Sequence, residues 1–244
     1  MTYNSQSKKY YANGKLMLTG EYVVLSGAEA IGLPLKKGQE LIIQKTSGRS
    51  ALAWKTFVLG NHWFDAYFSL PEFAIANTTD FPTAQILRDI FMAARELNPG
   101  FPDPRFHYEI ISKVNFDLNW GFGSSSSLLV NIAQWADIDP FELHFKISKG
   151  SGYDIATAKS DVPVLYKLEK GKPYFREVEL QAHFLDNIYF GYLGKKRRSA
   201  EAVNEYPYGQ IEKSGELNKI SSISREILKV KLITEFINLL KQHD

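Results

Sequence analysis

Two glycines and four serines stand together directly before an apolar segment of the chain. They read Gly121-Phe122-Gly123 followed by the serines 124–127. Glycine allows a tight turn and a close approach of the backbone to a ligand. Serines at the start of a helix would leave backbone N–H groups pointing at that ligand, and the helix dipole favours negative charge there. The run is typical of an anion-binding loop, although a glycine turn with capping serines would have the same sequence.

Three common signatures are missing from this chain. The dinucleotide-binding pattern needs a third glycine where Ser126 stands. The P-loop pattern G-x-x-x-x-G-K-[S/T] and the serine-hydrolase pattern G-x-S-x-G occur nowhere in the sequence. If the run binds phosphate, it is therefore a phosphate loop of another kind.

A carboxylate and an ammonium group lie in two further segments rich in small residues. Asp154 follows Ser151-Gly152-Tyr153, at the start of a predicted short helix. It could be a general base or only a helix N-cap, and the N-cap is commoner in general. Lys15 precedes an apolar strand that ends at Gly20-Glu21. Taken alone, such a lysine usually lies on a solvated edge.

In their order and spacing the three segments resemble the motifs of the GHMP kinases, the superfamily of galactokinase, homoserine kinase, mevalonate kinase and phosphomevalonate kinase. Residues 14–25 resemble the first motif, and residues 121–125 resemble the phosphate loop. Residues 151–154 resemble the segment with the catalytic aspartate. The resemblance covers nearly the whole chain. Gly-Tyr-Asp-Ile-Ala at 152–156 is most similar to a bacterial group assigned to the mevalonate pathway.

The resemblance implies an ATP-dependent kinase with a role for each motif. Asp154 would take the proton of the acceptor hydroxyl, and Lys15 would lie near Asp154, keep it ionised and stabilise the transferring phosphoryl group. Ser125 and Glu142 would hold Mg²⁺. The ATP phosphates would lie on the backbone amides of Gly121, Phe122, Gly123, Ser124, Ser125 and Ser126.

The implied substrate is a small hydroxylated carboxylic acid. Its contacts would be Glu21, Lys149, Lys196 and Arg197. Mevalonate ranks first and 5-phosphomevalonate second, because a phosphorylated acid needs at least two cations to converge with Lys149. A helix from Ser199 would turn part of the run 195–198 away, although that run is by default a solvated face.

A non-catalytic GHMP-like binder of small molecules remains an alternative. The family's third motif is a glycine-rich loop near the C-terminus, and no glycine follows Gly215. The implied fold is α+β in two layers. Residues 1–181 would form a nucleotide-binding domain like domain 2 of ribosomal protein S5. Residues 182–244 would form part of a ferredoxin-like domain that looks truncated.

Hydrophobic patterning predicts the elements that must position these residues. Apolar residues at i, i+3, i+4 and i+7 predict a helix over about 80–97, capped by Asp80 or Thr79 and stopped by Asn98-Pro99-Gly100. Further helices are expected over 128–133, 139–146, from about 199, and 223–243. Strands are expected over 15–18, 40–43, 105–112, 162–168, 174–180 and 187–193, with a hairpin in 53–70 that turns at Gly60-Asn61. Turns are expected at Gly32, Pro34 and Gly38, and the first nine residues as a solvated tail.

Composition excludes several other classes of protein. The 29 basic and 27 acidic residues leave a net charge of +2, too little for a general nucleic-acid coat. The chain has no cysteine, hence no disulfide and no thiolate metal site. The five histidines show no metal-binding spacing. No apolar run is long enough for a membrane span, and the polar N-terminus lacks a signal core, so we expect a cytoplasmic protein that binds a small molecule. A homodimer is left open.

Overall fold

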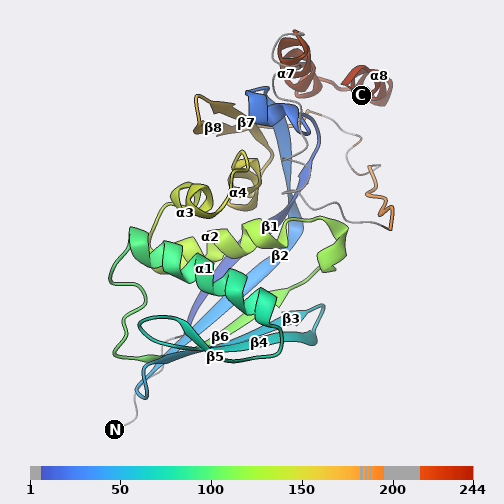
Figure 1. The fold of residues 1–244 in the computed structure, drawn as a ribbon. Coiled ribbons are helices and arrows are strands. Elements are labelled where there is room, and N and C mark those ends of the chain that lie inside the picture. The colour runs from blue at the N-terminus through green and yellow to red at the C-terminus, as the bar shows by residue number, and fades with distance from the viewer. Residues whose placement is uncertain (1–6, 182–183, 185, 187, 195–214, 244) are drawn as a thin grey trace. The chain divides into compact units, whose positions relative to one another are not determined.

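The computed structural model describes residues 7–181, 184, 186, 188–194 and 215–243. Strands and helices both occur in this part of the chain (Figure 1). The strands are β1 (Ser7–Met17), β2 (Ala30–Thr46), β3 (Ala51–Val58), β4 (Asn61–Ser69), β5 (Ala74–Thr78), β6 (His107–Val114), β7 (Val164–Glu169) and β8 (Lys172–Glu177). The helices are α1 (Phe81–Leu97), α2 (Ser124–Ala136), α3 (Pro140–Ile147), α4 (Tyr153–Ala158), α7 (Glu216–Ile227) and α8 (Ile233–His243), with short 3₁₀ turns η1 (Val23–Ser26) and η2 (Leu118–Trp120).

The described chain forms two compact units that interleave along the sequence. The first unit contains residues up to 12, 37–118 and 124–148. The second contains residues 13–36, 119–123 and the part from 149 onward. These units do not follow the predicted division near Gln181, which stays a prediction.

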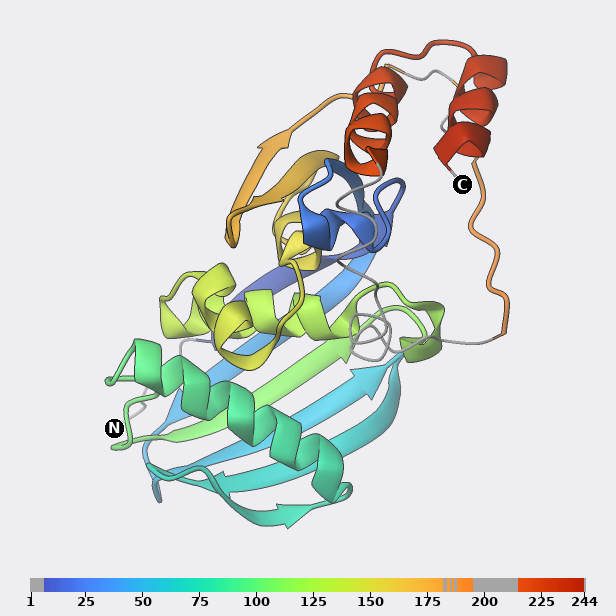
Figure 2. The ribbon, with the colours of Figure 1, turned by 45° about the horizontal axis from the view of Figure 1, so that its top comes forward.

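The first unit is a sheet covered on one face by helices α1 and α2, and α3 packs against these two helices (Figures 1 and 2). Its strand order is β5-β4-β3-β6-β2. Strands β3 and β6 run parallel, whereas β3–β4, β4–β5 and β2–β6 are antiparallel. The predicted hairpin is confirmed, because β3 and β4 pair, but its turn is Leu59-Gly60 and not Gly60-Asn61, since Asn61 already pairs with Val58. The serine run therefore lies at the start of α2, one of the helices on this sheet.

Helix α1 begins and ends as its sequence predicts. Asp80 is the N-cap, and its carboxylate accepts a hydrogen bond from the N–H of Thr83 at 2.9 Å. Pro82 stands in the first turn, where its missing N–H costs nothing. The apolar face is buried, with Phe91 at the centre of an aromatic cluster that also contains Trp54, Phe68 and Phe73.

A buried polar network fixes α2 to the sheet. The side chain of Gln39 on β2 donates to Ser112 on β6 at 2.7 Å and accepts from Ser127 on α2 at 2.8 Å. Asn131, one turn further along α2, donates to the backbone oxygen of Gln39 at 2.9 Å. Buried hydrogen bonds between these partners favour one arrangement of the elements that carry them. The last serine of the run thus has a structural role.

In the second unit, the strands expected over 162–168 and 174–180 form as β7 and β8, which pair around Lys170-Gly171, and β7 also pairs with the first residues of β2. Helices α7 and α8 pack on an apolar cluster in this unit (Figure 2). Its buried members are Ile31, Leu165, Val178, Phe184, Ile223, Ile227, Leu228, Val230 and Phe236.

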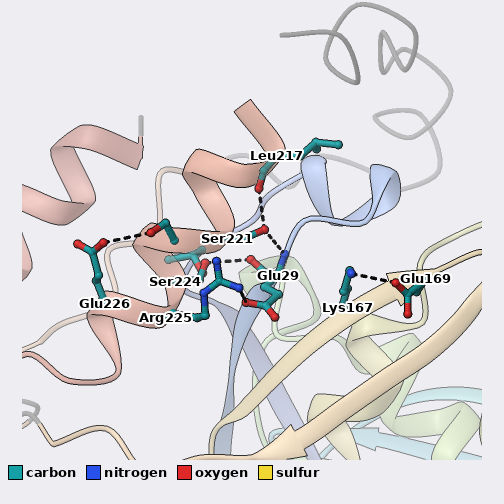
Figure 3. Close-up of polar contacts among 10 residues, drawn as sticks. Glu29, Lys167, Glu169, Leu217, Ser221, Ser224, Arg225 and Glu226 are labelled. Carbon is teal, nitrogen blue, oxygen red and sulfur yellow. Dashed lines mark hydrogen bonds and ion pairs between the residues drawn. The ribbon is translucent and has the colours of Figure 1, made fainter. Parts of the chain in front are cut away.

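Polar contacts fasten α7 to the segment that links the first motif to β2 (Figure 3). The hydroxyl of Ser221 accepts from the N–H of Glu29 at 3.0 Å, and that of Ser224 donates to the Glu29 carbonyl at 2.9 Å. Arg225 adds an ion pair with the Glu29 carboxylate at 3.1 Å. The hydroxyls of Ser224 and Thr19 lie 2.7 Å apart in the interior. Helix α7 therefore holds the chain within the first motif, at Thr19, and just after it, at Glu29.

Replacing Ser224 with alanine should destabilise the protein by about 1–3 kcal/mol, because the Glu29 carbonyl and the Thr19 hydroxyl would lose a buried partner. Ser222→Ala is the control, since the partner of the Ser222 hydroxyl among the described residues is the exposed Glu226 carboxylate of the same helix. We expect the control to change the free energy of unfolding by less than about 0.5 kcal/mol. Urea unfolding of both variants measures the difference, and equal effects would contradict the role given to Ser224.

The predicted turns at Gly32, Pro34 and Gly38 are wrong, because all three residues lie inside the long strand β2. Pro34 lies between the residues that pair with β7 and those that pair with β6, so its missing N–H removes no bond from either ladder. Gly32 is needed because a Cβ there would come within 2.2 Å of the Thr157 hydroxyl. Its glycine marks close packing of the strand and not a bend.

Other predicted boundaries also change. Ser7 to Lys9, expected as part of a solvated tail, belong to β1. The single C-terminal helix is two helices, because Leu228 and Val230 leave the helical path and pack into the core. The strand expected over 187–193 is not formed by residues 188–193, where Tyr189 and Leu193 are largely exposed. Aromatic residues favour a strand only where a pleated surface packs them.

The helix expected from about Ser199 lies outside the described residues. Within the described part of the chain, no helix combines the length and the apolarity that a membrane span requires.

Candidate active site

Lys15 and Asp154, 139 positions apart in sequence, form an ion pair in the second unit. The Lys15 Nζ lies 2.8 Å from an Asp154 carboxylate oxygen. Lys15 comes from β1 and Asp154 from the first turn of α4. The N-cap of α4 is Gly152, in the left-handed region at φ 80°. The alternative in which Asp154 only caps the helix is therefore wrong.

The ion pair is open to solvent. The side chains of Lys15 and Asp154 are 16% and 34% exposed. Pairs with this access to water contribute only about 0–1 kcal/mol to stability, since solvent screens the attraction and ordering two side chains costs entropy. The pair is accessible to a ligand, and other contacts must hold β1 against α4.

Two hydrogen bonds beside the pair provide that hold, and a third binds the strand to the glycine run. The Tyr153 hydroxyl donates to the Leu16 carbonyl at 2.6 Å. The Asn13 side chain donates to the Ser160 carbonyl at 2.8 Å, beyond the C-terminal end of α4. The N–H of Lys15 donates to the Phe122 carbonyl at 2.9 Å. The segment 13–16 is thus bound to the aspartate helix on either side of Lys15 and to the glycine run at Lys15 itself.

Two buried tyrosines lie beneath Asp154. Burial, and secondarily the Asp154 charge, raises the pKa of Tyr153 well above its usual value. The same causes raise the pKa of Tyr166, whose hydroxyl donates to the Ser151 carbonyl. Their rings meet edge to face with centroids 6.0 Å apart. Both phenols therefore remain protonated donors at any ordinary pH.

The glycine–serine run has the backbone that the sequence predicts. Gly121 and Gly123 have φ values of 76° and 79°, in the region that glycine favours, and α2 begins at Ser124. A Cβ on Gly121 would meet no protein atom within 4 Å, so the loop is open on that side. Ser125 is exposed, whereas Ser126 is buried. The first amides of any α-helix lack an intrahelical acceptor, which makes this helix start suited to an anion.

The other predicted site residues that the structure describes are on the surface. Glu142 is exposed in the first turn of α3, and no described hydrogen bond or ion pair links it to Ser125. Glu21 and Lys149 are exposed in the second unit. Lys196 and Arg197 lie outside the described residues. Among the residues that the structure describes, no group of three or more histidine, aspartate or glutamate side chains could hold a metal ion by itself.

Gly20 in the first motif cannot carry a side chain without a shift of the backbone. Its φ is 85°, and a Cβ would lie 2.6 Å from the Ala30 Cβ. Gly20→Ala should therefore destabilise the protein by about 1–3 kcal/mol through overpacking, beyond the strain of a left-handed alanine. Gly171→Ala is the control for strain alone, because its φ is 74° and its Cβ would meet nothing within 4 Å. Thermal unfolding of the two variants isolates the clash, and equal melting temperatures would contradict it.

Two features of this site were not predicted from the sequence. The Tyr153 hydroxyl and the Asn13 amide are each bonded to a backbone carbonyl far away in sequence. Such partners leave no periodic or local signal. Asn13 and Tyr153 do stand next to the motif residues, and that proximity is the one sequence feature that could have suggested a role.

Comparisons with known proteins give structural similarity alone. No protein-family model matches the chain, and no curated protein matches it. A phosphomevalonate kinase from Streptococcus pneumoniae, solved with phosphomevalonate and AMPPNP, is similar with a TM-score of 0.67 at 14% identity, over 97% of this chain and 78% of that one. The Methanococcus jannaschii mevalonate kinase is similar with a TM-score of 0.64 at 16% identity, over 100% of this chain and 78% of that one. The L. major mevalonate kinase, solved with R-mevalonate, is similar with a TM-score of 0.63 at 16% identity, over 99% of this chain and 74% of that one.

These similarities define a class of fold. The chain has a mixed α/β fold resembling that of the GHMP kinases, and it spans about three quarters of the length of those three solved chains. At 14–16% identity the likeness extends to the fold and not to a substrate.

Proposed function

We propose that this protein is an ATP-dependent phosphotransferase that phosphorylates a hydroxyl group of a small carboxylic acid. One observation carries the proposal. Within a single unit, Lys15 pairs with Asp154 through its side chain and binds the Phe122 carbonyl of the glycine run through its backbone. An acid–base pair beside a loop suited to phosphate can supply positioning and charge stabilisation, on which phosphoryl transfer to an alcohol depends.

In this proposal Asp154 accepts the proton of the acceptor hydroxyl while the oxygen of that hydroxyl attacks the γ-phosphorus of ATP. The bond from that phosphorus to the bridging oxygen of ADP then breaks, and ADP leaves. Lys15 orients the carboxylate and offers positive charge to the transferring group. Most of the rate enhancement in such reactions comes from positioning and charge stabilisation. The accessible pair suits these tasks, because both groups can reach a ligand without leaving a buried position.

The phosphates of ATP would lie on the segment 121–126. The two left-handed glycines support this assignment, as does the open space beside Gly121. Ser124 and Ser125 would contribute backbone amides at the start of α2. Ser126, which is buried, would contribute its backbone alone.

Mg²⁺ fits the oxygen ligands that Ser125 and Glu142 would offer. This ion commonly takes one or two protein oxygens and keeps waters and substrate phosphates as its other ligands, so a cluster of carboxylates is not required. Bound there, Mg²⁺ would neutralise charge on the phosphates.

Mevalonate is the substrate that we propose first, with 5-phosphomevalonate second. The similar solved structures include complexes with both acids, so the fold accommodates either class of acceptor. Glu21, Lys149, Lys196 and Arg197 would supply the contacts to the acid. In domain terms, we propose an S5-like part over 1–181 and part of a ferredoxin-like domain over 182–244, in a cytoplasmic protein.

The second candidate function is a GHMP-like binder that does not transfer phosphate. It is favoured by the exposed position of Glu142, which no described hydrogen bond or ion pair links to Ser125.

An ADP-release assay with four acceptors tests the proposal. Mevalonate, 5-phosphomevalonate, homoserine and galactose are each supplied with ATP and Mg²⁺, and ATP alone gives the background. We expect release above background with mevalonate, and none with Lys15→Met. Preference for 5-phosphomevalonate would reverse the substrate ranking. Nucleotide binding without acceptor-dependent release would favour the non-catalytic binder.

A further inference from the structure

We infer that Tyr153 is a positioning residue whose hydroxyl sets the distance between the strand that carries Lys15 and the helix that carries Asp154. Its effect on turnover rests on the proposed function, whereas its effect on the strand does not. Tyr153 and its hydrogen-bond partner are sequence neighbours of the two charged residues. Tyr153 precedes Asp154 directly, and the carbonyl that it binds belongs to Leu16, the neighbour of Lys15.

One hydrogen bond therefore joins the two segments that carry the ion pair, one residue away from the charged residue on each segment. Its length is 2.6 Å, and it joins β1 to the first residue of α4. Any lengthening between the Tyr153 hydroxyl and the Leu16 carbonyl moves the backbone of both charged residues. The ion pair cannot resist that movement alone, because both of its side chains have access to water.

The ring of Tyr153 is fixed by contacts that do not involve its hydroxyl. It is 2% exposed, and the Tyr166 ring lies edge-on against it. Gly32 of β2 packs so closely that an added Cβ would come within 2.9 Å of a Tyr153 ring carbon. The Lys15 ammonium lies 5.9 Å from the ring centroid. A phenylalanine would keep these contacts and lose only the hydrogen bond.

A second contact keeps the strand attached when that bond is lost. The Asn13 side chain bonds the Ser160 carbonyl at 2.8 Å and the Asp161 carboxylate at 2.9 Å. Tyr153→Phe should therefore loosen residues 14–17 without detaching the strand. Loss of the Tyr153 hydroxyl acts on geometry at the ion pair more than on the fold.

Tyr108→Phe is a matched control. Tyr108 is also buried, and its hydroxyl also donates to a backbone carbonyl, that of Asp103 at 3.1 Å, but it belongs to the first unit. Both variants lose one tyrosine hydroxyl bound to a carbonyl. A difference between them in turnover or in local exchange therefore reports the position of Tyr153 and not the loss of a buried hydrogen bond as such.

The test measures turnover and hydrogen exchange in both variants. We expect Tyr153→Phe to lower kcat by about 10- to 100-fold, as misplacement of reacting groups does, with KM for ATP within about twofold. Amide exchange in a peptide covering 13–17 should become faster, and Tyr108→Phe should change neither quantity. Unchanged exchange in that peptide, or a kcat equal to that of the Tyr108 variant, would overturn the inference. An inactive wild type would overturn the proposed function alone, since exchange would still decide the role of Tyr153.

Discussion

Replacing Asp154 with asparagine should lower turnover by about 10²- to 10⁴-fold, which is the usual contribution of a positioned acid–base group. The amide keeps the shape of the side chain but cannot take a proton from the acceptor. In the wild type the Lys15 Nζ lies 2.8 Å from an Asp154 carboxylate oxygen, and Lys15 should remain near the amide that replaces it. Affinity for ATP should change little, because the phosphates are assigned to the segment 121–126. Steady-state kinetics and calorimetry measure the two quantities.

Asp161→Asn is the matched control for this variant. Asp161 is an exposed aspartate of the same unit, and its carboxylate accepts a hydrogen bond from Asn13 at 2.9 Å, two residues before Lys15. The Asp161→Asn substitution removes a negative charge close to the strand that carries Lys15 and leaves the Lys15–Asp154 ion pair unchanged. We expect turnover within about twofold of the wild type, since the asparagine oxygen can still accept that bond. Near-normal turnover of Asp154→Asn would return Asp154 to a structural role.

Replacing Gly121 with valine should weaken nucleotide binding by at least about 100-fold. The φ of Gly121 is 76°, and no protein atom lies within 4 Å of a Cβ built there. The side chain would thus fill space that the proposal gives to the phosphates. Losing two hydrogen bonds to a charged ligand, at about 1.5–3 kcal/mol each, accounts for a change of this size. Calorimetric titration with ATP measures it.

Gly171→Val separates ligand clash from backbone strain. Gly171 has a φ of 74°, also has open space at its Cβ position, and lies in the β7–β8 turn. Both variants should lose similar stability, because a β-branched residue is strained in the left-handed region. Only Gly121→Val should lose affinity for ATP. Equal affinities in the two variants would show that the glycine run is a turn without a ligand.

Local sequence signals predicted the elements that depend on local contacts. The Asp80 cap and the apolar face of α1, and the Leu59-Gly60 hairpin, are fixed by residues close in sequence. Glycine in β2 misled the prediction, because Gly32 serves the packing of Tyr153 and Thr157, which are more than 120 residues away. The break between α7 and α8 has the same origin, since Leu228 and Val230 pack into a core that long-range contacts build.

The candidate site shows the same division. The spacing of small residues around Lys15, Gly121 and Asp154 predicts which segments matter. The sequence does not distinguish Ser125, which is exposed, from Ser127, which bonds Gln39 in the interior. Neither does it reveal that Tyr153 bonds the chain beside Lys15. Those distinctions depend on which backbone atoms the fold brings into contact.

The central claim is that this chain moves the terminal phosphoryl group of ATP to an alcohol, and label transfer tests it most directly. ATP labelled in its γ-phosphoryl group is incubated with Mg²⁺ and mevalonate, and the products are separated. We predict label on the organic acid with the wild type, and a loss of about 10²-fold or more with Asp154→Asn. Label that stays on ATP or appears only as free phosphate, with mevalonate, 5-phosphomevalonate, homoserine and galactose alike, would contradict the claim.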